Sequence, residues 1–360
     1  MTGHEELSLP TLCTLTLMSK VDWPLAISVA ASVGGRYPLE GTYHETRLAR
    51  DAPGLVARAS ELVSYETGLE APGNPEVAVV GRDEWAAMNV ASFSALLAPA
   101  EEQLSAHSGL GARLAGRIVG AEMGAVLGFL SRRVLGQYEL VLPNADGEIG
   151  DTVLFVGGNI LKMERDHAFR PDEFRFWVAL HESTHRLQFL GVPWLRDYFL
   201  GLVAELVASA KPEPGRLQRV SSQIQRAAAA GEPLIDESGL FGLLASEEQR
   251  AVIDRVQALM SLLEGHGHVV MDRIGGRELV TQQRMSRVLK ARRADKRTAA
   301  FMRLVGLEMK IRQYEMGERF INAIEREASW EALSLAWEGP EALPTLDEIS
   351  EPERWLKRVA

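Results

Sequence analysis

Residues 176–189 read Phe-Trp-Val-Ala-Leu-His-Glu-Ser-Thr-His-Arg-Leu-Gln-Phe, an apolar run that carries two histidines and a glutamate. Just before it, Pro171, Asp172 and Glu173 supply a proline and two carboxylates, which suit the amide-rich first turn of a helix. Pro193 follows the run and stops a helix. Between these limits the apolar residues recur at spacings of three and four. The segment is therefore predicted to be a helix that is buried over much of its surface.

The polar residues of this helix have the spacing HExxH, formed by His181, Glu182 and His185. Because residues four apart lie on one helix face, both imidazoles can reach a single metal, and Glu182 can reach the water bound to it. Zinc lowers the pKa of its water to about 7, and a carboxylate can take that proton and deliver it to a leaving group. Zn2+ is the predicted cofactor, and the alternative is a hydrogen-bonded histidine pair in the core.

A catalytic zinc usually takes a third protein ligand, for which the segment 259–272 is the best source. It places Glu264, His268 and Asp272 at intervals of four on one face of a second predicted helix. Glu264 is the predicted third ligand, with His268 as the alternative. Asp272 or His268 is predicted to hold a metal-binding histidine through its other ring nitrogen. A helical pair of Glu264 and His268 without a metal remains the other interpretation.

Two further features of the chain bear on a site around these helices. Gly265 and Gly267 flank His266, and glycine is costly inside a helix, so another backbone is expected to approach closely there. Hydrolysis also needs a donor to the oxyanion that develops on the attacked carbonyl. Tyr314 and His266 are the candidates for that catalytic role. Tyr314 can equally pack on the core with its hydroxyl at the surface.

The composition is that of a folded protein of 360 residues, with 46% hydrophobic and 24% charged residues. A net charge of -10 argues against nucleic acid as a partner. Cys13 is the only cysteine, which excludes an intrachain disulfide and an all-cysteine zinc site and favours the cytoplasm. No stretch is predicted to insert into a membrane, and the sequence does not determine the oligomeric state.

The coarse organisation is mainly helical. Residues 95–133 are patterned as amphipathic helices with glycines at spacing four, which permit close packing, and residues 77–80 and 152–156 are the clearest strands. The predicted division is a mainly helical region over 1–145 and a catalytic region over 146–360, or one continuous domain.

Several motifs together resemble a zincin-like family of hydrolases, whose members are often labelled as associated with deazaflavin coenzyme biosynthesis. The resemblance extends from Val21-Asp-Trp-Pro to Pro352-Glu-Arg-Trp-Leu356 and rests on HESTHRLQF, PWLRDY, LLEGHGHVVMD, LGQYEL and FVGGNI. It implies an α+β, predominantly α-helical fold of the gluzincin type, with a small sheet beside the active-site helix and Glu264 as the third ligand. By the same analogy, residues 153–159 are expected to form a strand at the cleft that pairs with extended substrate.

These observations predict a zinc-dependent hydrolase, in particular a metallopeptidase that acts on a peptide or small amide substrate. Glu182 would assist the attack of zinc-bound water on the peptide or amide bond. The alternatives are a non-catalytic zinc-binding scaffold and an accessory protein of cofactor metabolism that binds a small metabolite at the metal site.

Overall fold

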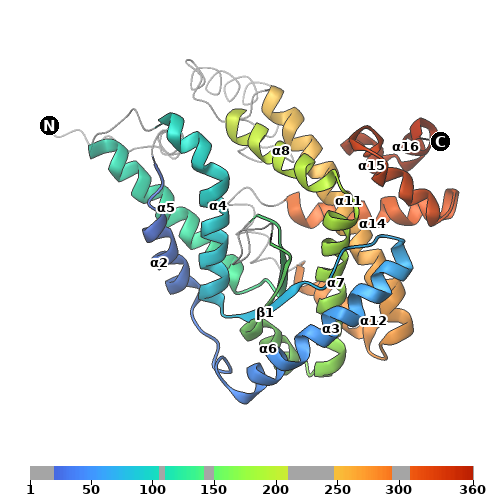
Figure 1. Ribbon diagram of the computed structural model, residues 1–360, viewed down its shortest axis with the longest axis horizontal. Coiled ribbons are helices and arrows are strands. Elements are labelled where there is room, and N and C mark those ends of the chain that lie inside the picture. Colours follow the sequence, from blue (N-terminus) through green and yellow to red (C-terminus); the bar gives the residue numbers. More distant parts are fainter. Residues whose placement is uncertain (1–19, 105–109, 142–149, 210–246, 294–308, 360) are drawn as a thin grey trace, which may run out of the picture.

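A computed structural model describes residues 20–104, 110–141, 150–209, 247–293 and 309–359 of the chain (Figure 1). Helices dominate it, and a small sheet lies among them, which confirms the expected α+β, predominantly helical architecture. Cys13 and its predicted consequences lie outside the described residues. The helices are α2 (Trp23–Gly34), α3 (Tyr43–Thr67), α4 (Arg82–Leu104), α5 (Leu110–Ser131), α6 (Gly157–Asp166), α7 (Pro171–Gly191), α8 (Leu195–Ser209), α11 (Glu247–Glu278), α12 (Gln282–Arg293), α14 (Met309–Glu327), α15 (Leu346–Ser350) and α16 (Pro352–Val359), with 3-10 turns η1 (Glu331–Trp337) and η2 (Pro340–Ala342).

The sheet has three strands in the order β1-β3-β2, namely β1 (Glu76–Val80), β2 (Gly136–Glu139) and β3 (Thr152–Val156). β1 runs parallel to β3, and β2 runs antiparallel to it. Every residue of β3 is buried, as expected for a short apolar strand covered on both faces. The two strands predicted from the sequence are confirmed, and β2 is added to them.

The expectation that residues 153–159 form a substrate-pairing edge strand is wrong. β3 is the central strand, so the hydrogen-bonding groups on both of its sides are used by β1 and β2. The strand ends at Val156, and Gly157 begins helix α6. Among the strands that the structure describes, β1 and β2 form the edges of this sheet.

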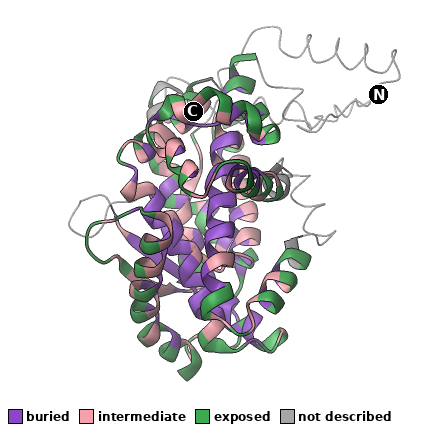
Figure 2. Cartoon of the chain, turned by 90° about the vertical axis from the view of Figure 1, so that its right-hand side faces the viewer, coloured by how far each residue is buried: buried purple, intermediate pink, exposed green. Residues whose placement is uncertain are grey.

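The larger of two hydrophobic clusters extends from α3 to the carboxy-terminal end of the described chain, and a smaller one joins α2, α4 and α5 to the sheet. The larger cluster includes Val56 of α3, Phe155 of β3, Leu180 of α7, Leu262 of α11 and Trp355 of α16, all almost completely buried. Figure 2 shows the buried residues concentrated on the central helices and the exposed residues on the outer ones. The division of the chain at residue 145 stays a prediction.

Helices α2 and α5 pack against each other along a row of glycines, as their spacing predicts. A Cβ atom at Gly120 or Gly124 would overlap the backbone of Asp22 or Ala26, so only glycine permits this approach.

Within the described residues, the segment Gly111–Ser131 is long and apolar enough to cross a membrane by length and composition alone. In its most apolar stretch of 18 residues, 33% are buried inside the structure. The absence of membrane insertion stays a prediction.

Helices α11 and α14 make a second close contact, at Gly265 and Gly317. A Cβ atom on Gly265 would overlap the backbone of Gly317, and one on Gly317 would overlap the carbonyl oxygen of Ser261. This confirms the close approach of another helix that Gly265 predicts. At Gly267 the nearest atom to an added Cβ is Cε1 of His185 at 3.7 Å, an ordinary contact distance.

Gly317→Ala is expected to lower the free energy of unfolding by about 1–3 kcal/mol, because the methyl group forces α14 away from α11. Urea unfolding of the two proteins measures the change. Gly276→Ala is the matched control, since it lies on α11 with open space around the added methyl group and gains helix propensity. Equal stability of Gly317→Ala and the wild-type protein would contradict the close helix contact.

Candidate metal centre

Helix α7 places the HExxH residues at the centre of the fold. Its first turn contains Pro171 and the two predicted carboxylates, and it ends at Gly191, two residues before Pro193, so the predicted helix is confirmed. Thirteen of its residues are buried, because α3, α11, β2 and β3 pack around it. In Figure 1, α2, α4 and α5 lie to the left of α7, and α15 and α16 lie to its right.

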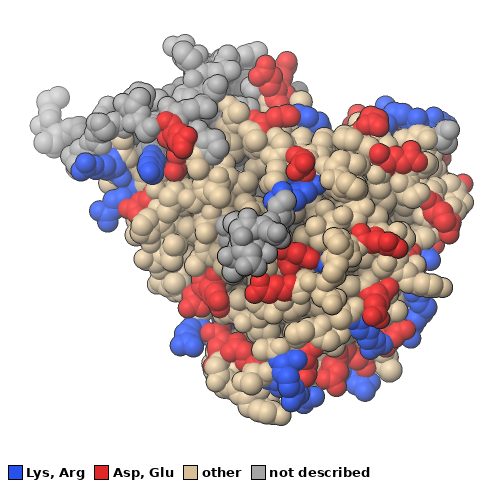
Figure 3. Space-filling model, viewed as in Figure 1, with Lys and Arg blue, Asp and Glu red and all other residues tan. Residues whose placement is uncertain are grey.

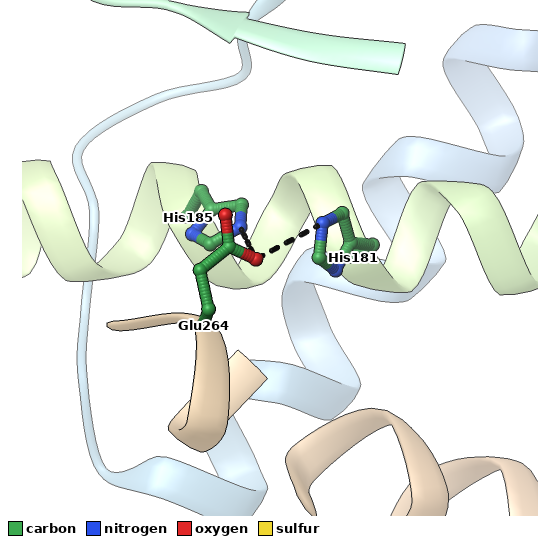
Figure 4. Close-up of side chains that lie close together, drawn as sticks. All are labelled: His181, His185 and Glu264. Atoms are coloured by element: carbon green, nitrogen blue, oxygen red, sulfur yellow. Dashed lines mark ion pairs between the residues drawn. The ribbon is translucent and has the colours of Figure 1, made fainter. Parts of the chain in front are cut away.

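The structure brings His181, His185 and Glu264 together from α7 and α11 (Figure 4). One ligand atom from each side chain lies within 4.8 Å of the others. Oε2 of Glu264 is 3.9 Å from Nε2 of His181 and 3.7 Å from Nε2 of His185. The two imidazole rings are nearly perpendicular, at an interplanar angle of 81°. The facing nitrogens and the carboxylate oxygen thus surround one point.

This donor set fits a divalent metal ion. Two imidazole nitrogens and one carboxylate oxygen form the ligand set of a His2Glu zinc site, which keeps a further position open. Glu264 is 7% exposed, and a carboxylate at that depth requires compensation for the water it has lost. Gly267 leaves room beside the His185 ring. His181, His185 and Glu264 are therefore the residues that could hold the ion.

The charge state of His185 is governed by its neighbour on α11. Burial pulls the pKa of His185 down, but the hydrogen bond and negative charge of Glu264 outweigh it and raise the pKa to about 9. Glu182 adds to this effect. His185 and Glu264 are therefore electrostatically coupled across the interface of α7 and α11.

Glu182 lies at the outer edge of strand β2 and is 4% exposed. The N–H of Val156 donates to the carbonyl of Leu135, and from this pair the alternation of an antiparallel ladder turns the N–H groups of Gly136 and Tyr138 away from β3. The outward N–H of Tyr138 faces the Glu182 carboxylate and lowers its pKa. β2 therefore holds the acidic side chain that follows the first histidine.

Burial raises the pKa of Glu182 to about 8, and the negative charge of Glu264 acts in the same direction. The charge of His185 and the backbone N–H of Tyr138 oppose this rise. Gly136 leaves the space that the carboxylate occupies: a Cβ atom there would lie 2.7 Å from Oε1, 2.8 Å from Cγ and 2.9 Å from Cδ of Glu182.

Gln188 is a residue of the site that the sequence did not identify. Its side chain is completely buried, and its Oε1 atom is 2.9 Å from Nδ1 of His185. The only signal in the sequence is a polar residue three positions after a histidine in an apolar helix, which is the spacing of side chains that meet on one face.

His266 lies behind Gln188, as seen from the cluster of metal-binding atoms. Its Nδ1 atom is 3.0 Å from Nε2 of Gln188, and its ring stacks on Trp330 with centroids 5.7 Å apart. Burial lowers the pKa of His266 to about 3, with a smaller contribution from His185, so the ring is neutral. Its role as an oxyanion donor stays a prediction.

The other predicted site residues occupy different surroundings. The ring centroids of His268 and His181 are 5.9 Å apart. The Sδ atom of Met271 lies 3.1 Å from Nδ1 of His181. Asp272 accepts a hydrogen bond of 2.6 Å from Nε2 of Gln282. The expected support of a metal-binding histidine by Asp272 or His268 stays a prediction. Tyr314 is in helix α14, and its side chain lies outside the described residues.

Comparisons with known proteins agree with this geometry. The model of a family described as zincin-like metallopeptidase matches residues 21–356. A solved structure from Chloroflexus aurantiacus, entitled "a putative hydrolase with a novel fold", is 31% identical. The match covers 94% of this chain and 98% of that one, with a TM-score of 0.70. No curated protein matches the chain.

Proposed function

The chain belongs to the zincin-like metallopeptidase family, and we propose that it is a zinc-dependent hydrolase that cleaves peptide or amide bonds. The observation that carries the proposal is the convergence of His181, His185 and Glu264, with Glu182 held beside them by the edge of β2. The family and its solved relative support a metal-dependent hydrolase in general. The metal, the bond and the substrate are the parts that we propose.

Each residue of the site would have one task. His181, His185 and Glu264 would hold the ion, which when bound supplies a Lewis acid and a water of lowered pKa. Glu182 would take the proton of the attacking water and deliver it to the leaving amine. The Tyr138 N–H faces the Glu182 carboxylate, and Gly136 leaves room for it.

The edge of β2 supports a peptide as the substrate. Glu182 lies against the outer edge of β2 at Gly136 and Tyr138, so an extended peptide that pairs with the groups of this edge that Glu182 does not occupy would lie next to the base. The pairing role expected of β3 thus passes to β2. On the face viewed in Figure 3, acidic and basic side chains are interspersed. This face therefore has no uniform charge that would select substrates of the opposite charge.

Gly136→Ala is expected to reduce kcat by about 100-fold, the effect of displacing a catalytic group by roughly an ångström. The new methyl group would occupy the space of the Glu182 carboxylate, whereas the metal-binding side chains would keep their places. Initial rates and zinc content of the same preparation measure both effects. Gly54→Ala on α3 is the control, because no atom lies within 4 Å of its added Cβ. A wild-type kcat in Gly136→Ala would show that catalysis does not depend on the space that Gly136 leaves for Glu182.

The proposed activity is tested by incubating the zinc-loaded protein with a peptide library and identifying the products by mass spectrometry. Cleavage that stops on removal of zinc and returns on its addition is the expected result. A zinc-loaded protein that cleaves no member of the library would favour the scaffold instead, which shares the metal but has no turnover.

The accessory-protein alternative receives no separate support from the site. Glu182, the residue that a non-catalytic protein would not need, is present and lies against Gly136 of β2. The deazaflavin label, the cytoplasmic location and the absence of a nucleic-acid partner stay predictions.

A further inference from the structure

We propose that Gln188 is a positioning residue that fixes the tautomer of His185, and that Leu263 and His266 hold the Gln188 amide in the orientation this requires. The inference rests on the proposed function, because it concerns how one ligand is prepared for the ion. It concerns a residue outside the HExxH motif itself.

The Gln188 amide makes three hydrogen bonds while completely buried. Its Nε2 atom lies 3.0 Å from the carbonyl oxygen of Leu263 and 3.0 Å from Nδ1 of His266. Its Oε1 atom lies 2.9 Å from Nδ1 of His185. The two amide hydrogens and the amide oxygen are all used, so every polar group of this side chain has a defined partner.

The carbonyl of Leu263 determines which way the amide faces. A backbone carbonyl can only accept a hydrogen bond, so the atom of Gln188 that faces it must be the nitrogen. The reverse orientation would place two oxygens opposite each other at 3.0 Å. The amide oxygen is therefore fixed on the side of His185.

This orientation in turn determines the tautomer of His185. An amide oxygen only accepts, so Nδ1 of His185 must carry a hydrogen and donate it to Gln188. Nε2 is then the nitrogen that is left to bind a metal, and it is the atom that faces Glu264 at 3.7 Å. Leu263 precedes Glu264 in the chain. The Gln188 amide therefore also links the backbone next to Glu264 to the side chain of His185.

His266 has a place in this arrangement that does not require contact with substrate. Its ring is clamped by aromatic neighbours, stacked on Trp330 and edge-on to Trp337 at 5.5 Å. Its Nδ1 atom accepts the second amide hydrogen of Gln188. The result is a chain of hydrogen bonds from His266 through Gln188 to His185. Metal-binding histidines are commonly supported by a carboxylate or a carbonyl, and a neutral amide gives the same direction without adding charge.

Two variants separate the acceptor of Gln188 from its donors. Gln188→Leu removes both, whereas Gln188→Glu keeps an oxygen that accepts from His185 and loses the amide hydrogens that bind Leu263 and His266. We expect zinc affinity, measured by competition with a chelator, to fall about 10- to 100-fold in Gln188→Leu and to fall less in Gln188→Glu, whose carboxylate still accepts from His185 although its second oxygen faces the Leu263 carbonyl. The Tm of the metal-free protein is expected to fall in both variants.

Thr184→Val is the matched control, since its buried hydroxyl donates to the carbonyl of Leu180 on the same helix. It should leave zinc affinity unchanged. Wild-type zinc affinity in Gln188→Leu would overturn the proposal, and so would equal losses in Gln188→Leu and Gln188→Glu, which indicate a structural role alone. If Gln188→Leu does not fold, weak zinc binding by Gln188→Glu also overturns it. Failure of the wild-type protein to bind zinc would instead reject the proposed function.

Discussion

Glu182→Gln is expected to bind zinc like the wild-type protein and to lose hydrolysis by about 10²- to 10⁴-fold, the usual contribution of a positioned general base. Glutamine has the shape of glutamate, and its Oε1 atom can still face the Tyr138 N–H. It cannot take a proton from the attacking water. Initial rates on a peptide identified in the library, together with zinc content, measure the two properties separately.

Ser183→Ala provides the control for this experiment. Ser183 follows Glu182 on α7, is fully buried, and its hydroxyl has no hydrogen-bond partner among the described residues. Removal of that hydroxyl should leave both zinc content and rate unchanged. If Glu182→Gln retains the wild-type rate while binding zinc, Glu182 is not the base, and the assignment of the reaction to this carboxylate fails.

Glu264→Ala is expected to lose zinc. It removes one of the three ligands and leaves the two imidazoles of α7 without their carboxylate partner. The loss in affinity should exceed the roughly 10- to 100-fold effect of removing a group that only supports a ligand. Chelator competition measures it directly, and circular dichroism of the metal-free protein checks that the helices remain.

Stoichiometric zinc in Glu264→Ala would reject Glu264 as the third ligand. His268 would then be the first alternative, because its ring lies 5.9 Å from that of His181 on the same helix as Glu264. Loss of zinc in His268→Ala with retention in Glu264→Ala would assign the site to three histidines. The two variants therefore distinguish the ligand sets that the spacing of α11 allows.

The helical part of the site could be predicted because its information is local. HExxH fixes which residues of α7 share a face, and the interval of four does the same for Glu264 and His268 on α11. Periodicity does not reveal how α11 is rotated against α7. In the structure the contact between Gly265 and Gly317 fixes α11 against α14, and Glu264 faces both histidines.

The sheet could be predicted only in part, because strand order depends on contacts between distant residues. The five buried residues of β3 identify a strand, yet the same pattern suits an edge or a centre. β2 has four residues and only two of them are buried, so its sequence carries no periodic signal. For the same reason, the approach of Glu182 to Gly136 of β2 and the contacts of Gln188 with Leu263 and His266 appear only in the folded chain.

Metal content is the most direct test of whether His181, His185 and Glu264 form a zinc site. Untagged protein is dialysed against buffer containing zinc, freed of excess ion, and analysed by mass spectrometry together with His185→Ala and Glu264→Ala. One zinc per chain in the wild-type protein, with little in either variant, is the result we predict. A wild-type protein that remains free of metal after zinc addition would contradict the metal centre and the hydrolase proposed from it.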